Sequence, residues 1–142
     1  MTDGKSLDFR IPSDVQYIEG VVGQVVERCQ ALAYSRRHTA LNVPVALTEA
    51  LSNAILRGNG DDARRAVVVR VEIDDVQLVA EVRDEGTGFD LLACTEDSTS
   101  AENLHREDGR GLFLMQKLMD RVERYTEQAT GGNVVRLVLH RA

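Results

Sequence analysis

The sequence has few of the residues that metal centres and disulfide frameworks need. It contains two cysteines, Cys29 and Cys94, and three histidines, His38, His105 and His140. No two of them stand at the spacing of a zinc site or a nucleophilic triad, so neither chemistry is expected. Cys29 falls on the apolar side of a predicted helix and is interpreted as a small buried hydrophobe. Cys94 lies in a polar segment, where an exposed thiol is expected.

The sequence also lacks an excess of basic residues and any long apolar run. Its 17 basic and 23 acidic side chains give a formal net charge of −6, which does not favour direct contact with nucleic acid. No stretch approaches the roughly 20 apolar residues that span a bilayer, and MTDGKSLDFR has no signal-peptide core. The sequence therefore predicts a cytoplasmic protein without membrane contact. A length of 142 residues, with 43% hydrophobic composition, predicts a single domain over 1–142.

Three common nucleotide and kinase signatures are absent. Gly4-Lys5-Ser6 matches the end of a P-loop, but only three residues precede it, too few for the required upstream glycine. Gly86 and Gly88 are followed by Leu91 rather than by the third glycine of a dinucleotide-binding loop. The His-Arg-Asp catalytic loop of eukaryotic-type kinases is missing as well.

Apolar periodicity predicts an alternation of strands and helices with no internal repeat. A Ser13–Gln16 capping box and Pro44 mark the expected starts of the first two helices. The predicted strands are 7–11, 67–73, 76–83, 121–126 and 134–141, and the predicted helices are 13–32, 44–56 and one from 112. This order favours an α+β fold, a two-layer α/β sandwich whose mixed, mostly antiparallel sheet is covered by helices on one face.

Glu49 and Asn53 lie four residues apart and therefore share one face of the second predicted helix. The apolar residues of the opposite face are Leu47, Leu51 and Ala54, together with Gly58. Such a pair can supply one oxygen ligand to Mg²⁺ and a carboxylate beside a nucleophile. Most helical pairs of this kind are simply solvated, so the pair gains meaning only with the two motifs that follow.

Asp84 follows a predicted strand, and Gly86 and Gly88 open the loop after it. A short carboxylate at a strand end can accept hydrogen bonds from an exocyclic amine such as that of adenine. The glycines allow the backbone to approach a planar base closely.

Gly109, Arg110, Gly111 and Leu112 stand directly before the last predicted helix. Glycines that open a helix expose backbone N–H groups and the positive end of the helix dipole to a polyphosphate. Alone, this pattern is typical of an ordinary loop-to-helix junction.

Together the three motifs resemble the GHKL ATPases, which include gyrase, histidine kinases and MutL. The segments ALTEALSNAILRGN, VRDEGTGFD and GRGLFLMQKLMDRVE are similar to the RsbW-like anti-sigma-factor serine kinases of bacterial partner-switching systems. The resemblance covers 7–140 and implies a Bergerat-type ATP-binding fold with ATP and Mg²⁺ as cofactors.

The resemblance also implies roles for individual residues. Glu49 matches the catalytic general base, Asn53 the Mg²⁺ ligand and Asp84 the adenine-reading carboxylate. The remaining nucleotide-binding residues that it implies are Arg57, Gly86, Gly88, Phe89, Gly109, Arg110, Gly111, Leu112 and Asn133.

The polar segment at about 90–108 corresponds to the ATP lid of that family, and Arg106 and Arg110 are candidates for phosphate contact. Two positions depart from the family pattern. Arg57 stands where relatives commonly have histidine, and Gly132-Asn133-Val134 replaces a Gly-Thr-Thr-type sequence, so the amide of Asn133 would have to replace a hydroxyl contact.

The function implied is that of an anti-sigma factor and ATP-dependent serine kinase, acting in transcription regulation. Its expected partners are a sigma factor and a STAS-type anti-anti-sigma protein that carries the substrate serine. Formation of a homodimer is left open. Two alternatives remain: a nucleotide-gated protein-binding module without phosphoryl transfer, and the catalytic domain of a histidine kinase, for which a phosphoacceptor helix pair is missing.

Overall fold

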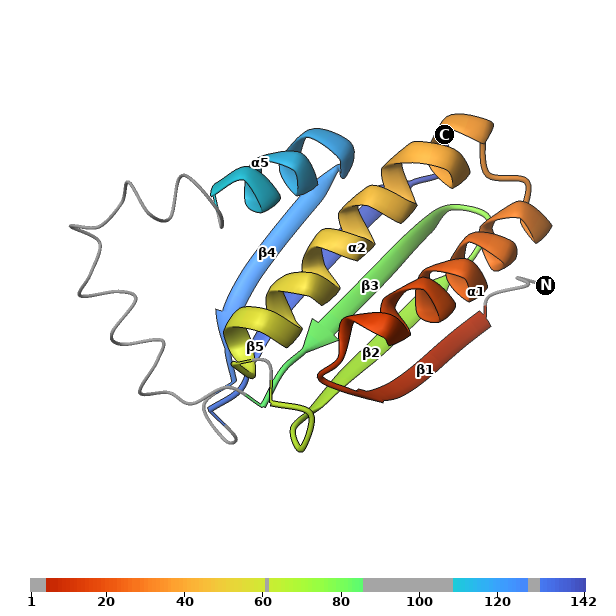
Figure 1. Ribbon diagram of the computed structural model, residues 1–142. Helices are drawn as coiled ribbons and strands as arrows, with labels where there is room; N and C mark the ends of the chain where they lie inside the picture. Colours follow the sequence, from red (N-terminus) through yellow and green to blue (C-terminus); the bar gives the residue numbers. More distant parts are fainter. Residues whose placement is uncertain (1–4, 61, 86–108, 128–130) are drawn as a thin grey trace.

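The computed structural model describes residues 5–60, 62–85, 109–127 and 131–142, which form two layers (Figure 1). The strands are β1 (Lys5–Pro12), β2 (Ala66–Ile73), β3 (Gln77–Arg83), β4 (Arg121–Thr126) and β5 (Asn133–His140). The helices are α1 (Ile18–Ala31), α2 (Val43–Asn53) and α5 (Gly109–Leu118).

The described strands form one sheet in the order β1-β2-β3-β5-β4, with every neighbouring pair antiparallel. The central strands are in register, so that Val69 of β2 stands beside Phe9 of β1 and Val82 of β3. The helices lie together on one face of the sheet, with α2 between α1 and α5 (Figure 1). This architecture confirms the α+β fold with helices on one face.

The core lies between the helix layer and the alternate residues of the strands that point toward it. Buried residues of the sheet are Val67, Val69, Val71, Ile73, Leu78, Ala80, Val82, Leu137 and Leu139. Leu47, Leu51 and Ile55 cover them from α2 and its extension, and burying each side chain contributes about 1.5–3 kcal/mol. Cys29 is part of this core, as expected, and burial raises the pKa of its thiol to about 12. Cys94 lies outside the described residues.

The helical backbone around α2 is longer than the sequence indicates. Wider π-helical turns at His38–Asn42 and Ala54–Gly58 precede and follow α2, so helical structure runs without a break from Arg36 to Gly58. Pro44 lies in the first turn of α2, as predicted, although helical structure already begins before it. Proline lacks an N–H and crowds the preceding turn, and the wider turn before α2 accommodates it within a continuing helix.

The predicted capping box before α1 is wrong. Asp14, not Ser13, is the capping residue, and its carboxylate accepts a hydrogen bond from the Gln16 backbone N–H at 3.0 Å. A 3₁₀ turn at Val15–Tyr17 then leads into α1. Ser13 is buried and contacts other parts of the fold.

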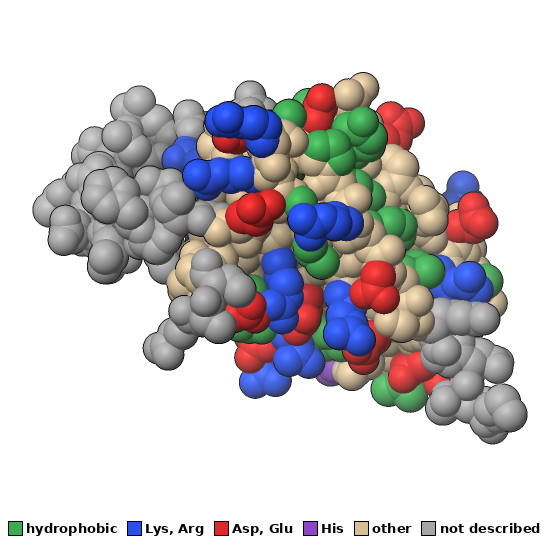
Figure 2. All heavy atoms as spheres, turned by 90° about the horizontal axis from the view of Figure 1, so that it is seen from below, with side chains coloured by type: hydrophobic (Ala, Val, Ile, Leu, Met, Phe, Trp, Pro, Cys, Tyr) green, Lys and Arg blue, Asp and Glu red, His purple; other side chains and the backbone are tan. Residues whose placement is uncertain are grey.

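Charged side chains occupy the strand positions that point away from the helices. Arg70 of β2 lies 3.8 Å from both Asp8 and Glu72, and Arg136 of β5 lies 3.9 Å from Glu123. In the view of Figure 2, acidic and basic side chains are interspersed over the described surface. None of the described helices is long and apolar enough to cross a membrane.

Candidate functional site

Glu49 and Asn53 lie one turn apart on α2, and the first turn of α5 lies against both of them. A Cβ built on Gly111 would lie 3.2 Å from Oε2 of Glu49 and 3.3 Å from Nδ2 of Asn53. Gly111 itself is buried, and the two polar side chains are half-buried. The structure therefore brings the first and third sequence motifs into contact, with backbone rather than a side chain facing the polar pair.

Asp84 follows the end of β3 and projects toward the helix layer, on the same side of the sheet as Val82. Its carboxylate lies against the backbone of Gly58, where a Cβ would come within 1.8 Å of Oδ2. Asp84 is half-buried. The end of the helical segment and the end of β3 are therefore in direct contact, and only glycine at position 58 permits this approach.

Asn133 holds Asp84 from the neighbouring strand. Its backbone N–H and its side-chain amide donate hydrogen bonds to Oδ1 of Asp84 at 3.0 and 3.2 Å. Burial raises the pKa of Asp84 above its ordinary value, while the Asn133 hydrogen bonds and the nearby charge of Arg65 act in the opposite direction. The Asp84 carboxylate is thus partly desolvated and held in one orientation. Both properties suit a group that accepts a hydrogen bond from one specific donor.

The two clusters lie along a single helical segment. Glu49 and Gly58 are nine residues apart, so their separation along the helix axis is about 13 Å. One elongated ligand lying along this segment could contact the Asp84 carboxylate at one end and the Glu49–Asn53 pair at the other. A flat donor group and a polyphosphate would fit the two ends, respectively.

The donor set fits a metal that needs few protein ligands. Within the described part of the chain, no group of three His, Cys, Asp or Glu side chains is arranged to hold a metal ion. Mg²⁺ is usually bound by one or two protein oxygens together with phosphates and water. The amide of Asn53, beside the carboxylate of Glu49 and the backbone of Gly111, suits that kind of site.

The other predicted residues are placed as follows. Leu112 packs against the core, and Arg57 is exposed near the end of the helical segment and makes contacts there. Gly109 and Arg110 begin α5. The predicted residues Gly86, Gly88, Phe89 and Arg106, with the lid at about 90–108, lie outside the described residues.

Sequence reasoning missed the contacts of Gly58, Asn59 and Ser13. The sequence pattern places Gly58 on the apolar face of the second helix and Ser13 in a cap, and it assigns no role to Asn59. The Gly-Asn-Gly sequence at 58–60 indicates a helix terminus, and the φ of +63° at Gly60 agrees with it. The contacts of the three residues join segments distant in sequence, so no local pattern reveals them.

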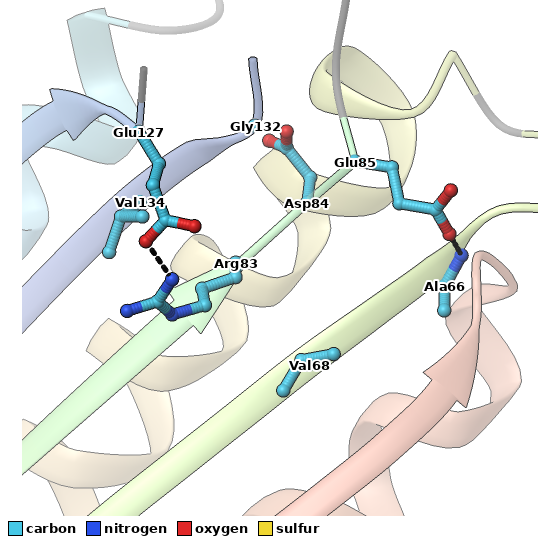
Figure 3. A pocket seen from close by; sticks show the side chains of 8 residues that line it. All are labelled: Ala66, Val68, Arg83, Asp84, Glu85, Glu127, Gly132 and Val134. Carbon is cyan, nitrogen blue, oxygen red and sulfur yellow. Dashed lines mark hydrogen bonds and ion pairs between the residues drawn. The ribbon is translucent and has the colours of Figure 1, made fainter. Parts of the chain in front are cut away.

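A cavity of about 360 Å³ lies mainly on the sheet face that the helices leave open (Figure 3). It is lined by Ala66, Val68, Arg83, Asp84, Glu85, Glu127, Gly132 and Val134. Arg83 and Glu127 form an ion pair on one side of it, whereas the Asp84 carboxylate points away from that pair (Figure 3). Asp84 lines this cavity but Glu49, Asn53 and Gly111 do not, so the cavity touches only the Asp84 end of the place where the motifs meet.

Residues 11–139 match the family described as histidine kinase-like ATPase domain. Among curated proteins, the chain is similar to an anti-sigma F factor of Clostridium perfringens, with 29% identity over 96 residues, 66% of this chain and 68% of the relative. It is also similar to a serine-protein kinase RsbW of Bacillus pumilus, with 28% identity over 138 residues, 91% of this chain and 82% of the relative.

The fold is similar to a crystal structure of the RsbU and RsbW domains of a Mycobacterium tuberculosis protein. The TM-score is 0.67 at 18% sequence identity, with 95% of this chain covered. The match spans 32% of that longer chain. At this identity the likeness shows the fold.

Proposed function

Because the chain belongs to the family of histidine kinase-like ATPase domains, we propose that it binds ATP between α2, the end of β3 and the start of α5. One observation carries the proposal: Glu49 and Asn53 lie against Gly111, while Asp84 lies against Gly58 of the same helical segment. Three motifs that are far apart in the sequence thus meet along one helical segment.

In the proposed complex, Asp84 accepts a hydrogen bond from the exocyclic amine of adenine. Asn133 and Gly58 support this role because they fix the carboxylate from two sides. The partly desolvated environment of Asp84 strengthens a hydrogen bond made to it. Asn133 would thus contribute to base recognition by orienting the Asp84 carboxylate.

At the other end, the backbone of the first turn of α5 faces the phosphates, and Asn53 supplies an oxygen ligand for Mg²⁺. The metal, when bound, neutralises charge on the phosphate oxygens. Glu49 orients an incoming serine hydroxyl and accepts its proton. The first turn of α5 also contains Gly109, Arg110 and Leu112, whose backbone N–H groups would face the phosphates.

The biological activity proposed is that of an anti-sigma factor and serine protein kinase in a cytoplasmic partner switch. The names of the two relatives, anti-sigma F factor and serine-protein kinase RsbW, support this assignment. The substrate would be a serine of a STAS-type anti-anti-sigma protein. A phosphate adds about −1.5 to −2 charge units, and the net charge of −6 favours release of the phosphorylated partner.

A nucleotide-gated binding module without phosphoryl transfer is the second candidate. It would need the Asp84 end of the site but no general base. The position of Glu49 against the start of α5 favours the kinase, because a carboxylate near bound phosphates is unfavourable unless it has a chemical role.

The experiment for the proposal has two steps. Calorimetry with ADP and ATP, with and without Mg²⁺, tests whether the chain binds nucleotide. Incubation with γ-labelled ATP and a purified STAS-domain protein encoded near this chain then tests for transfer to serine. Binding with transfer supports the kinase, binding without transfer supports the binding module, and no binding contradicts both.

A further inference from the structure

Asn59, the residue after the helical segment, is the best connected buried polar side chain near the site. Only 1% of its surface is exposed. Its Nδ2 donates to Oγ of Ser13 at 2.8 Å and to the carbonyl of Ala66 at 2.9 Å. Its Oδ1 accepts from the backbone N–H of Glu85 at 2.8 Å. The Asn59 amide therefore joins the end of the helical segment to Ser13 after β1, to the start of β2 and to the residue after Asp84.

We propose that Asn59 is a positioning residue for the nucleotide, holding the Asp84–Glu85 junction against the end of the helical segment so that the Asp84 carboxylate meets the base. The inference rests on the proposed nucleotide site. Asn59 acts through Glu85 and needs no contact with the ligand.

Two hydrogen bonds hold the backbone of the junction. On one side, the backbone N–H of Asp84 donates to the carbonyl of Asn133 at 3.0 Å, which continues the β3–β5 ladder. On the other side, the backbone N–H of Glu85 is bound by Asn59. The Glu85 side chain also accepts from the backbone N–H of Ala66, but the bond to Asn59 is the one that ties the backbone of the junction to the end of the helical segment. Without it, the junction is held less closely against Gly58. Hydrogen-bond recognition depends steeply on distance and angle, so a small displacement weakens binding of the base.

Ser13 extends the same network by one step. Its Oγ accepts from Asn59 and donates to the carbonyl of Arg65 at 2.8 Å. Ser13 therefore fixes the amide of Asn59 without touching Asp84 or Glu85. Removing its hydroxyl loosens the network while leaving the Asn59–Glu85 bond available, which predicts a smaller effect than the loss of Asn59 itself.

The test compares Asn59→Ala with Asn42→Ala by calorimetry with ADP, at a temperature where both variants are folded. Asn42 is a matched control, since it is buried and donates to the carbonyl of Leu118 at 2.7 Å. It lies 16 residues before Gly58, about 24 Å along the helix axis. We expect Asn59→Ala to weaken ADP binding about 10-fold and Asn42→Ala less than twofold, even where both lower the Tm.

A double-mutant cycle separates positioning from general loss of stability. If Asn59 acts by placing Asp84, Asn59→Ala should weaken ADP binding no more than about twofold in an Asp84→Asn background. Additive effects of the two substitutions would overturn the inference. If Asn59→Ala does not fold, Ser13→Ala takes its place in both measurements, with an expected loss of about threefold.

The outcomes also separate this inference from the proposed function. If the wild-type protein binds ADP and Asn59→Ala, or Ser13→Ala in its place, binds ADP equally well, the positioning role alone is overturned. Wild-type protein that does not bind ADP would overturn the nucleotide site and the inference together.

Discussion

Gly58 and Asp84 are in closer contact than any side chain at position 58 would allow. A Cβ there would lie 1.8 Å from Oδ2 and 2.8 Å from the Cβ of Asp84. Rotation of the aspartate side chain could move the first atom but not the second. The end of the helical segment therefore sets how far Asp84 can extend, and this contact links the helix that carries Glu49 to the strand that carries the carboxylate.

Gly58→Ala should destabilise the fold by about 1–3 kcal/mol and weaken nucleotide binding, because the end of β3 must shift. Gly23→Ala is the control, since a Cβ there meets nothing within 4 Å on the exposed face of α1. It should stabilise the protein by about 0.5–1 kcal/mol. Denaturant unfolding of both variants checks the prediction, and equal stabilities would contradict the close packing.

Asp84→Asn should weaken ADP and ATP binding alike, by about 1.5–3 kcal/mol, through loss of a charge-assisted hydrogen bond. Calorimetry measures both affinities. Asp8→Asn makes the same chemical change at an exposed residue of β1 and should leave both affinities unchanged. Unchanged ADP affinity in Asp84→Asn would remove the base-reading role from this residue.

The pKa of Asp84 should be above that of an ordinary aspartate, because burial disfavours its charged form. Its contribution to stability is then greatest below the unfolded pKa of about 3.9 and is lost as pH rises through the folded pKa. Nucleotide binding follows the opposite direction and weakens as pH falls through the folded pKa.

Asn133→Ala should raise the pKa of Asp84 further, since one donor to the carboxylate is lost. Carboxyl-selective NMR titration measures both values. Asp74 is an internal reference, because backbone hydrogen bonds from Gln77 and Val76 lower its pKa. A pKa of Asp84 below that of Asp74 would refute the described environment.

Asn53→Ala should leave the fold intact, because Asn53 is half-buried and does not belong to the apolar core. It should weaken ATP binding in the presence of Mg²⁺ and leave metal-free binding almost unchanged. Calorimetry with and without the metal gives the difference. A variant that unfolds while its Mg²⁺ dependence persists would make Asn53 a structural residue.

Local sequence patterns predicted the sheet strands and the buried face of α2. Alternation in Val67–Ile73 and the spacing of Leu47, Leu51 and Ala54 both arise from one-sided burial, and the structure buries these residues. The first-helix cap was wrong because Ser13 bonds with Arg65 and Asn59 rather than with the following turn. Such contacts form only once distant segments are packed together.

The candidate site was predictable by residue type but not in its arrangement. Spacing placed Glu49 beside Asn53, yet nothing local to Gly111 or Gly58 indicates which side chains they face. The roles of Glu49, Asn53, Asp84 and Asn133 remain predictions. The glycine contacts explain why two helix ends can approach polar side chains so closely.

The most direct test of the kinase assignment is transfer of labelled γ-phosphate from ATP to the serine of a STAS-domain partner by wild type and by Glu49→Gln. The account predicts that Glu49→Gln keeps its ATP affinity and loses about 10²- to 10⁴-fold in transfer rate. Glu27→Gln, the same change on an exposed face of α1, should transfer at the wild-type rate. A Glu49→Gln protein as fast as wild type, or wild type that transfers no phosphate, would contradict the assignment of Glu49 as the base.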